Sequence, residues 1–270
     1  MNQESWLTSH SYLRPLAEFH SQVELALAEL PPPTTIVPSW DRYLDEFDRG
    51  IPLLRSSEAA VFLEPAMGMV VSLIENIASR PLPSDLQSET RALATQVRHA
   101  TNRRHVLHCL LGQDQFASDH SGLLFYLGWK ALGRHLRSVI DAYSIWREEE
   151  RWLRSFCPTC GSVPAMAQLI GNEAGCLRLL SCCYCGTRWR YQRIACPFCE
   201  KEDGHRLESI TIKEEPGLRI DYCRLCRGYL KTYVGQGSEA ILLADWTSVH
   251  LDVIARNRGL KRLAASLYEL

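Results

Sequence analysis

Cysteine is the residue type with the clearest chemical pattern in this chain. Ten of the eleven cysteines lie between residues 157 and 226, and only Cys109 precedes them. Eight of the ten form CxxC pairs, in which two thiols three positions apart share one tight turn: Cys157 and Cys160, Cys182 and Cys185, Cys196 and Cys199, and Cys223 and Cys226. In a reducing compartment such pairs indicate metal or redox chemistry more than structural disulfides.

The gaps between the pairs group them two by two. Twenty-one residues separate the first pair from the second, ten separate the second from the third, and twenty-three separate the third from the fourth. An internal repeat agrees, because "CPTCG" and "CPFCE" open the two halves, and "LRLLSC" and "LRIDYC" lead into their second turns. The pattern predicts two consecutive four-thiolate sites rather than an interleaved cross-brace. It makes Cys182 a ligand and leaves the adjacent Cys183 outside the set.

Four thiolates presented by two such turns suit a tetrahedral zinc or iron ion, and the sequence does not separate the two metals. Binding of this kind contributes roughly 10–16 kcal/mol of apparent folding free energy in zinc-finger peptides, more than a small ribbon core supplies. A closed four-thiolate site has no open coordination position, which argues against hydrolysis at the metal. The alternatives are cysteines without metal, reduced or disulfide-bonded, and an oxidoreductase that uses free CxxC pairs of depressed pKa.

The elements that must position these turns are short strands. Between residues 155 and 235, runs such as "CLRLLSC" and "LRIDYC" predict strands joined by thiol-bearing turns. Earlier in the chain, apolar periodicity predicts helices over 11–30, 62–79 and 85–99, and another that carries Leu124, Leu127, Ala131, Leu132, His135 and Val139. The sequence thus predicts a mainly α N-terminal helical domain (1–150), two tandem rubredoxin-like or zinc-ribbon β modules (151–194 and 195–235), and a C-terminal helical segment (236–270) that packs on the rest.

The composition is that of an ordinary globular protein. The chain has 270 residues, of which 46% are hydrophobic and 23% charged, and its formal net charge is -1, so no global field marks a polyanionic partner. The N-terminus lacks the basic and apolar regions of a secretory signal. Apolar stretches such as "GLLFYLGW" are much shorter than the roughly 20 residues that cross a bilayer. These features predict a cytoplasmic protein.

Basic and aromatic residues gather between the second and third cysteine pairs. Four of them, Arg188, Trp189, Arg190 and Arg193, could contact phosphates and stack on bases in a zinc ribbon that binds nucleic acid. The alternative interpretation places Trp189 in the ribbon core, with the arginines in solvent or against a protein. The second interpretation is favoured because the chain as a whole is not basic.

Other residues give weaker indications of chemistry. His105 and His108 share a predicted helix face and could bind a metal, but the interpretation as polar histidines on an amphipathic helix is favoured. Cys109, Cys176 and Cys183 fall outside the CxxC pairs and are expected to be packed thiols. The sequence contains no HExxH, G-x-S-x-G or P-loop motif, so no catalytic residue is assigned.

Three segments together resemble the formate dehydrogenase accessory (FdhE) family: "CPTCGSVP", "LSCCYCGTRWRYQRIACPFC" and "RIDYCRLCRGYLKTY". The closing "LLADWTSVHLDVIARNRG" is similar to that family's C-terminal helix, so the likeness covers residues 157–260 in order and spacing. Two positions depart from the family pattern: Glu200 stands where the third turn usually has glycine, and Cys183 is an additional cysteine. The chain also starts late relative to the family.

The resemblance implies a cytoplasmic maturation factor, not an enzyme. Such a factor is required for active formate dehydrogenase and binds its molybdenum-containing catalytic subunit before export. The resemblance also implies iron, with zinc as the alternative, at two rubredoxin-like sites held by the eight paired cysteines. Tyr229 and Lys231 match the end of the family's last motif, CxxCxxYLK.

Overall fold

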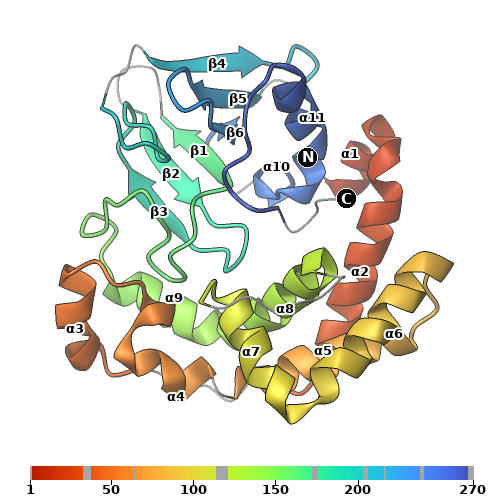
Figure 1. The fold of residues 1–270 in the computed structure, drawn as a ribbon. Helices are drawn as coiled ribbons and strands as arrows, with labels where there is room; N and C mark the ends of the chain where they lie inside the picture. Colours follow the sequence, from red (N-terminus) through yellow and green to blue (C-terminus); the bar gives the residue numbers. More distant parts are fainter. Residues whose placement is uncertain are drawn as a thin grey trace. The chain divides into compact units, whose positions relative to one another are not determined.

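The computed structural model describes residues 2–32, 38–63, 65–113, 121–171, 176–202, 206–215, 217–237 and 240–266 (Figure 1). It divides the chain into two compact units. The helical unit runs from Arg14 to Trp146. The ribbon unit combines the N-terminal thirteen residues with the chain from Arg147 onward.

The helical unit is built around one central helix. Helix α5 contacts α2, α6 and α8, and its apolar face (Met67, Val70, Ile74 and Ile77) is buried, as its periodicity predicts. The described α-helices of this unit are α2 (Arg14–Glu29), α3 (Trp40–Asp48), α4 (Ala60–Leu63), α5 (Ala66–Ser79), α6 (Ser84–Arg98), α7 (Ala100–Leu110), α8 (Ser121–His135) and α9 (Arg137–Trp146). Single 3₁₀ turns, η2 (Leu53–Arg55) and η3 (Ser57–Ala59), precede α4.

The helix predicted over 62–79 is interrupted near its start. Residues 60–63 form the short helix α4, and α5 begins only at Ala66. Pro65 stands at the N-cap of α5, where its missing N–H costs nothing, whereas inside a helix it would remove a hydrogen bond. The helix predicted to carry Leu124 and Val139 is likewise divided into α8 and α9.

None of the described helices is by itself both long and apolar enough to cross a bilayer. The segments Ser57–Leu63 and Ala66–Ser79 reach that length and apolar character only together, and the chain bends by 42° between them.

The ribbon unit contains one six-stranded sheet in the described part of the chain, with the order β3-β2-β1-β6-β5-β4. Each cysteine repeat supplies one antiparallel three-stranded meander. In both repeats a CxxC turn precedes the first strand, and a second CxxC turn joins the second strand to the third. The strands are β1 (Met166–Ile170), β2 (Leu177–Ser181), β3 (Arg188–Tyr191), β4 (Leu207–Thr211), β5 (Leu218–Cys223) and β6 (Tyr229–Val234).

The two meanders are not separate sheets. Strand β1 of the first meander pairs in parallel with β6 of the second, with Met166 opposite Lys231 and Leu169 opposite Val234. Both strands are buried along most of their length, whereas the residues of the edge strand β4 are half-buried or exposed. Parallel strands are usually covered on both faces, which agrees with the burial of β1 and β6.

Helices from both ends of the chain pack in the ribbon unit. Helix α11 (Val249–Asn257) contacts β5 and β6, and α10 (Ala240–Leu243) contacts β1. Helix α1 (Gln3–Ser9) belongs to the same unit, where the Trp6 indole N–H donates to the Thr247 carbonyl at 3.0 Å. The first thirteen residues therefore belong to the ribbon unit. The sequence analysis predicts them as part of the N-terminal helical domain. The division of the chain into four domains, with the bounds given above, remains a prediction.

A buried network of charges fixes the C-terminal segment to the sheet. The Lys231 ammonium is fully buried on β6 and contacts carboxylate oxygens of Asp245 (2.5 Å) and Asp252 (2.9 Å). Arg262 contacts the same two carboxylates at 2.9 and 2.6 Å. Two cations thus face two anions, which balances the charge of a region with little solvent. Tyr229 also donates to Asp252 at 2.7 Å, so Tyr229 and Lys231 of the "YLK" segment both take part in this network.

Candidate metal centres

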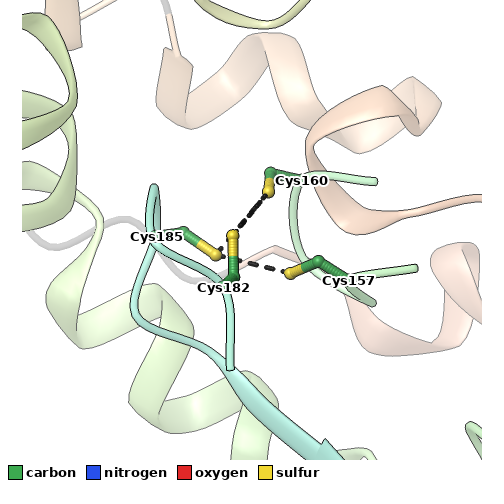
Figure 2. Close-up of side chains that lie close together, drawn as sticks. All are labelled: Cys157, Cys160, Cys182 and Cys185. Atoms are coloured by element: carbon green, nitrogen blue, oxygen red, sulfur yellow. Dashed lines mark hydrogen bonds between the residues drawn. The ribbon is translucent and has the colours of Figure 1, made fainter. Parts of the chain in front are cut away.

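The first cysteine cluster lies where the turn before β1 meets the turn between β2 and β3. Cys157, Cys160, Cys182 and Cys185 come together with their four sulfurs within 4.8 Å of one another, all of them buried (Figure 2). The Sγ–Sγ distances are 3.5 Å for Cys157 and Cys185, 3.4 Å for Cys160 and Cys182, and 3.8 Å for Cys160 and Cys185. Sulfurs about 2.3 Å from a tetrahedral zinc would lie ~3.8 Å apart, so the spacing fits a four-thiolate metal site.

The second cluster repeats this arrangement one module later. Cys196, Cys199, Cys223 and Cys226 also lie within 4.8 Å of one another, with Sγ–Sγ distances of 3.7 Å for Cys196 and Cys226 and 3.9 Å for Cys199 and Cys223. Cys199 and Cys226 are only half-buried. Both clusters combine consecutive turns, as the gap lengths predict, and neither is interleaved with the other.

Disulfides do not account for either cluster. The structure describes all eleven cysteines, and each is a free thiol. The shortest Sγ–Sγ distance quoted above, 3.4 Å, is far beyond the roughly 2.05 Å of a disulfide bond. The clusters are therefore sets of four separate thiols, each able to offer one sulfur to an ion.

The four CxxC turns share one backbone design. In each turn the N–H of the first cysteine donates to the carbonyl five residues later, at distances of 2.8 to 3.2 Å. The residue after the second cysteine adopts a positive φ in all four: Gly161 (79°), Gly186 (72°), Glu200 (55°) and Arg227 (63°). Glycine adopts this conformation without steric cost, whereas other residues do so rarely. Glu200, the position that departs from the family pattern, therefore keeps the backbone that glycine would have.

Polar groups around the sulfurs differ between the clusters. In the first, hydroxyls of Ser162 and Thr187 lie 2.9 Å from Cys160 Sγ and 3.2 Å from Cys185 Sγ. In the second, backbone N–H groups of Phe198 and Gly228 donate to Cys196 Sγ and Cys226 Sγ at 3.5 and 3.4 Å. The backbone N–H donors stabilise thiolates and so favour metal binding in the second cluster.

Burial and mutual hydrogen bonding set the thiol pKa values in the first cluster. Burial raises the pKa of Cys157 and of Cys160 well above the ordinary value. Burial also opposes ionisation of Cys185, but hydrogen bonds with the other three thiols and with Thr187 outweigh it and lower the pKa of Cys185 well below normal. A divalent ion would stabilise the thiolate form of all four cysteines.

The second cluster follows the same rule less strongly. Burial raises the pKa of Cys196 and of Cys226. At Cys223 burial is outweighed by hydrogen bonds, first from the backbone of Cys226 and Leu225, and the pKa falls. Each cluster thus contains a cysteine, Cys185 or Cys223, whose thiol pKa is lowered.

The basic and aromatic set is only partly exposed: Arg190 and Arg193 are exposed, whereas Arg188 is half-buried and Trp189 is buried. Trp189 is fully buried, and its indole N–H donates to the Arg154 carbonyl at 3.0 Å, so it cannot stack on a base. Arg188 is half-buried and donates to the Gln168 side chain, and Arg190 pairs with Glu150 at 2.6 Å. The structure therefore does not favour the nucleic-acid interpretation, and Trp189 is a core residue of the first module.

The remaining candidates lie apart from the two clusters. His105 and His108 are exposed on α7, and within the described residues neither belongs to a group of three metal-ligating side chains. Cys109 is buried in the helical unit, and Cys176 is half-buried in the ribbon unit. Cys183 donates to the Ala265 carbonyl at 3.2 Å, whereas its neighbour Cys182 faces the first cluster.

Sequence reasoning missed one further group. His10, Glu215 and His250 converge in the ribbon unit with ligand atoms within 4.8 Å of one another. They come from the N-terminal segment, the loop between β4 and β5, and α11. No local spacing links three such distant positions, so the sequence alone gives no signal for them.

The fold and the clusters define the class of protein: a helical unit followed by two fused rubredoxin-like modules, each with four converging cysteines. No family model matches the chain. Among curated proteins it is similar to an FdhE homolog of Pseudomonas aeruginosa (38% identity over 123 residues, 42% of this chain and 39% of that protein) and to one of Aquifex aeolicus (33% over 116 residues, 42% and 41%). The chain also matches an FdhE homolog of Pectobacterium carotovorum at 26% identity over 200 residues, 73% of this chain and 58% of that protein.

The matches thus span about two fifths to three fifths of the length of these relatives. A solved structure has the same fold: the crystal structure of the FdhE protein from Pseudomonas aeruginosa, with a TM-score of 0.67 and 23% identity, covers 95% of this chain and 88% of that chain. The chain is thus similar to FdhE proteins in sequence over part of its length, and it shares the fold of one of them over 95% of its length.

Proposed function

We propose that this protein is a cytoplasmic accessory factor for the maturation of formate dehydrogenase, and that it binds the catalytic subunit of that enzyme without being an enzyme itself. The similarity to FdhE proteins in part of the sequence and in the fold supports the class of function. The observation that carries the proposal is the pair of four-cysteine clusters, because closed four-thiolate sites stabilise a surface and leave no coordination position for substrate.

The proposed metal ligands are the eight cysteines of the two clusters. Cys182 and Cys183 offer a matched test because they are adjacent and only Cys182 faces a cluster. Cys182→Ser is expected to lower the metal content by one ion per chain, whereas Cys183→Ser is expected to keep two. Equal metal content in the two variants would contradict the ligand assignment.

Partner binding is tested by co-purification. The full chain and the catalytic subunit of formate dehydrogenase are expressed together, and capture of one is expected to retain the other. The Cys183→Ser chain is expected to retain the subunit as the wild type does, and the Cys182→Ser chain to lose it. Failure of the metal-loaded wild-type chain to retain the subunit would contradict the proposed partner.

We propose iron as the native metal, with zinc as the alternative. A four-thiolate iron site supplies a one-electron ferrous/ferric couple, whereas zinc supplies only structural stabilisation. The half-buried sulfurs Cys199 and Cys226 make the second module the better candidate for electron exchange with a client cofactor. Redox titration of protein purified without oxygen tests this. Full function of the zinc-loaded chain, or the absence of an accessible potential, would rule out an electron-transfer role.

A further inference from the structure

The strongest unassigned feature is the group formed by His10, Glu215 and His250. The carboxylate of Glu215 lies between the two imidazoles: its Oε1 is 2.9 Å from His10 Nε2, and its Oε2 is 2.8 Å from His250 Nε2. The side chains of His10 and Glu215 are each 11% exposed, and that of His250 is 17% exposed. The group is therefore mostly sheltered from solvent, yet it is reachable.

The hydrogen bonds of His10 define which ring nitrogen carries its proton. Its Nδ1 lies 3.0 Å from the Trp6 carbonyl oxygen, which can only accept a hydrogen bond, so Nδ1 must be the donor. Neutral His10 then directs the bare lone pair of Nε2 at a carboxylate oxygen 2.9 Å away. Two lone pairs at that distance repel each other unless a cation lies between them, and this cation is either a proton or a metal ion.

The surroundings of His10 match those of a metal-bound histidine. A histidine that binds a metal through one ring nitrogen usually donates from the other to a carbonyl or carboxylate, as His10 does to Trp6. The His10 ring stacks on the Trp6 indole, with centroids 4.1 Å apart and an interplanar angle of 18°. These contacts fix the direction of Nε2 before any ion binds, which lowers the cost of ordering the site.

The distances within the group also suit an ion. Ligand atoms about 2.0–2.1 Å from a tetrahedral zinc lie ~3.3 Å apart, so the two Nε2 atoms, which are 2.8 and 2.9 Å from the Glu215 oxygens, need to move away by only about 0.5 Å to admit an ion. Two imidazoles and one carboxylate are a ligand set for divalent transition metals such as Zn²⁺ or Fe²⁺. Three protein ligands leave a coordination position for water or for a donor atom of a bound molecule.

We propose that His10, Glu215 and His250 form a third metal site, of the two-histidine, one-carboxylate type, that holds one divalent transition-metal ion with an open position. This site differs in kind from the two cysteine clusters, which are closed. It also links helix α1 and α11 to the loop after β4, so the ion would fix the N-terminal segment in the ribbon unit.

The test uses the full chain with both cysteine clusters already loaded with zinc. Further Zn²⁺ is added in a calorimetric titration near neutral pH. One more ion per chain is expected to bind to the wild type. His250→Ala and Glu215→Gln are expected to weaken this step at least ~100-fold, because even the loss of a partner outside the ligand set costs roughly 10–100-fold.

Two control variants separate this site from other histidines and from misfolding. Tyr12→Phe alters a ring next to His10 and His250 without removing a ligand, and His105→Ala removes an exposed histidine of the other unit. Both are expected to bind the third ion as the wild type does. An unchanged content of two zinc ions per chain shows that each variant is folded. The proposal is overturned if the wild type binds no third ion, or if His250→Ala and Glu215→Gln bind it as tightly as the wild type.

Discussion

The two ribbon modules repeat one order of turns and strands but surround their sulfurs differently. In the first module all four cysteines are buried, and glycine occupies the positive-φ position of both turns, Gly161 and Gly186. In the second module two cysteines are half-buried, and Glu200 and Arg227 occupy the corresponding positions. The comparison indicates that the first module has an unstrained backbone at its two turns and sulfurs sheltered from water. The second module has non-glycine residues at positive φ, which strains its backbone, and its sulfurs lie closer to solvent.

The largest expected difference between the modules concerns metal loss. Cys157→Ser removes a fully buried ligand, and Cys199→Ser removes a half-buried one. Each is expected to release one ion, and metal binding contributes on the order of 10 kcal/mol to small thiolate domains. We expect Cys157→Ser to lower the melting temperature more than Cys199→Ser, because the buried thiols left behind cannot reach water. Calorimetry with metal analysis measures both. A larger decrease in melting temperature for Cys199→Ser than for Cys157→Ser would contradict the expected difference between the modules.

The next effect concerns the strand that joins the modules. Lys231 lies on β6, opposite Met166 of the first meander, and its ammonium is completely buried. Lys231→Met is expected to destabilise the ribbon unit by about 3–5 kcal/mol, because Asp245 and Asp252 lose a buried partner. Arg190→Ala, which breaks an exposed pair with Glu150, should cost at most about 1 kcal/mol. Chemical denaturation compares the two.

The same network predicts a response to acid. Burial alone would raise the pKa of Asp245, but Lys231 and Arg262 outweigh it and lower that pKa to about 2. A carboxyl group with a depressed pKa stabilises the fold above its unfolded pKa of roughly 3.9, and this contribution is lost as the pH falls toward 2. In Lys231→Met the native pKa of Asp245 rises toward its unfolded value, so the stability lost on acidification should be smaller than in the wild type. Identical acid-unfolding curves for the two chains would contradict the role given to Lys231.

Two substitutions at the positive-φ positions of the CxxC turns are expected to change folding stability slightly and in opposite directions. Gly161→Ala places a side chain at a φ of 79° and should cost about 1–2 kcal/mol. Arg227→Gly relieves a non-glycine residue at 63° and should stabilise the second module by up to about 1 kcal/mol, less the hydrogen bond that Arg227 donates to the Arg258 carbonyl. Stability curves of the metal-loaded variants measure both. The same sign for both substitutions would refute the strain assignment.

The sequence predicts these features unequally, for physical reasons. The CxxC turns, their consecutive grouping and the face of α5 follow from local spacing, which determines local geometry. The parallel pairing of β1 with β6 joins strands more than 60 positions apart, and no periodicity within either strand encodes it. The break between α4 and α5 can be explained by Pro65 once the structure is known. The apolar periodicity of the sequence continues across this position and therefore does not predict the break. His10, Glu215 and His250 meet only because the N-terminal segment folds onto the ribbons, so their meeting depends on tertiary packing.

The most direct test of the account is X-ray absorption spectroscopy with metal analysis on chain purified without oxygen. It is best done on His250→Ala, so that only the cysteine clusters contribute. The account predicts two ions per chain, each with four sulfur ligands at about 2.3 Å. A folded chain that holds no metal, or ions bound mainly through nitrogen or oxygen, would contradict it.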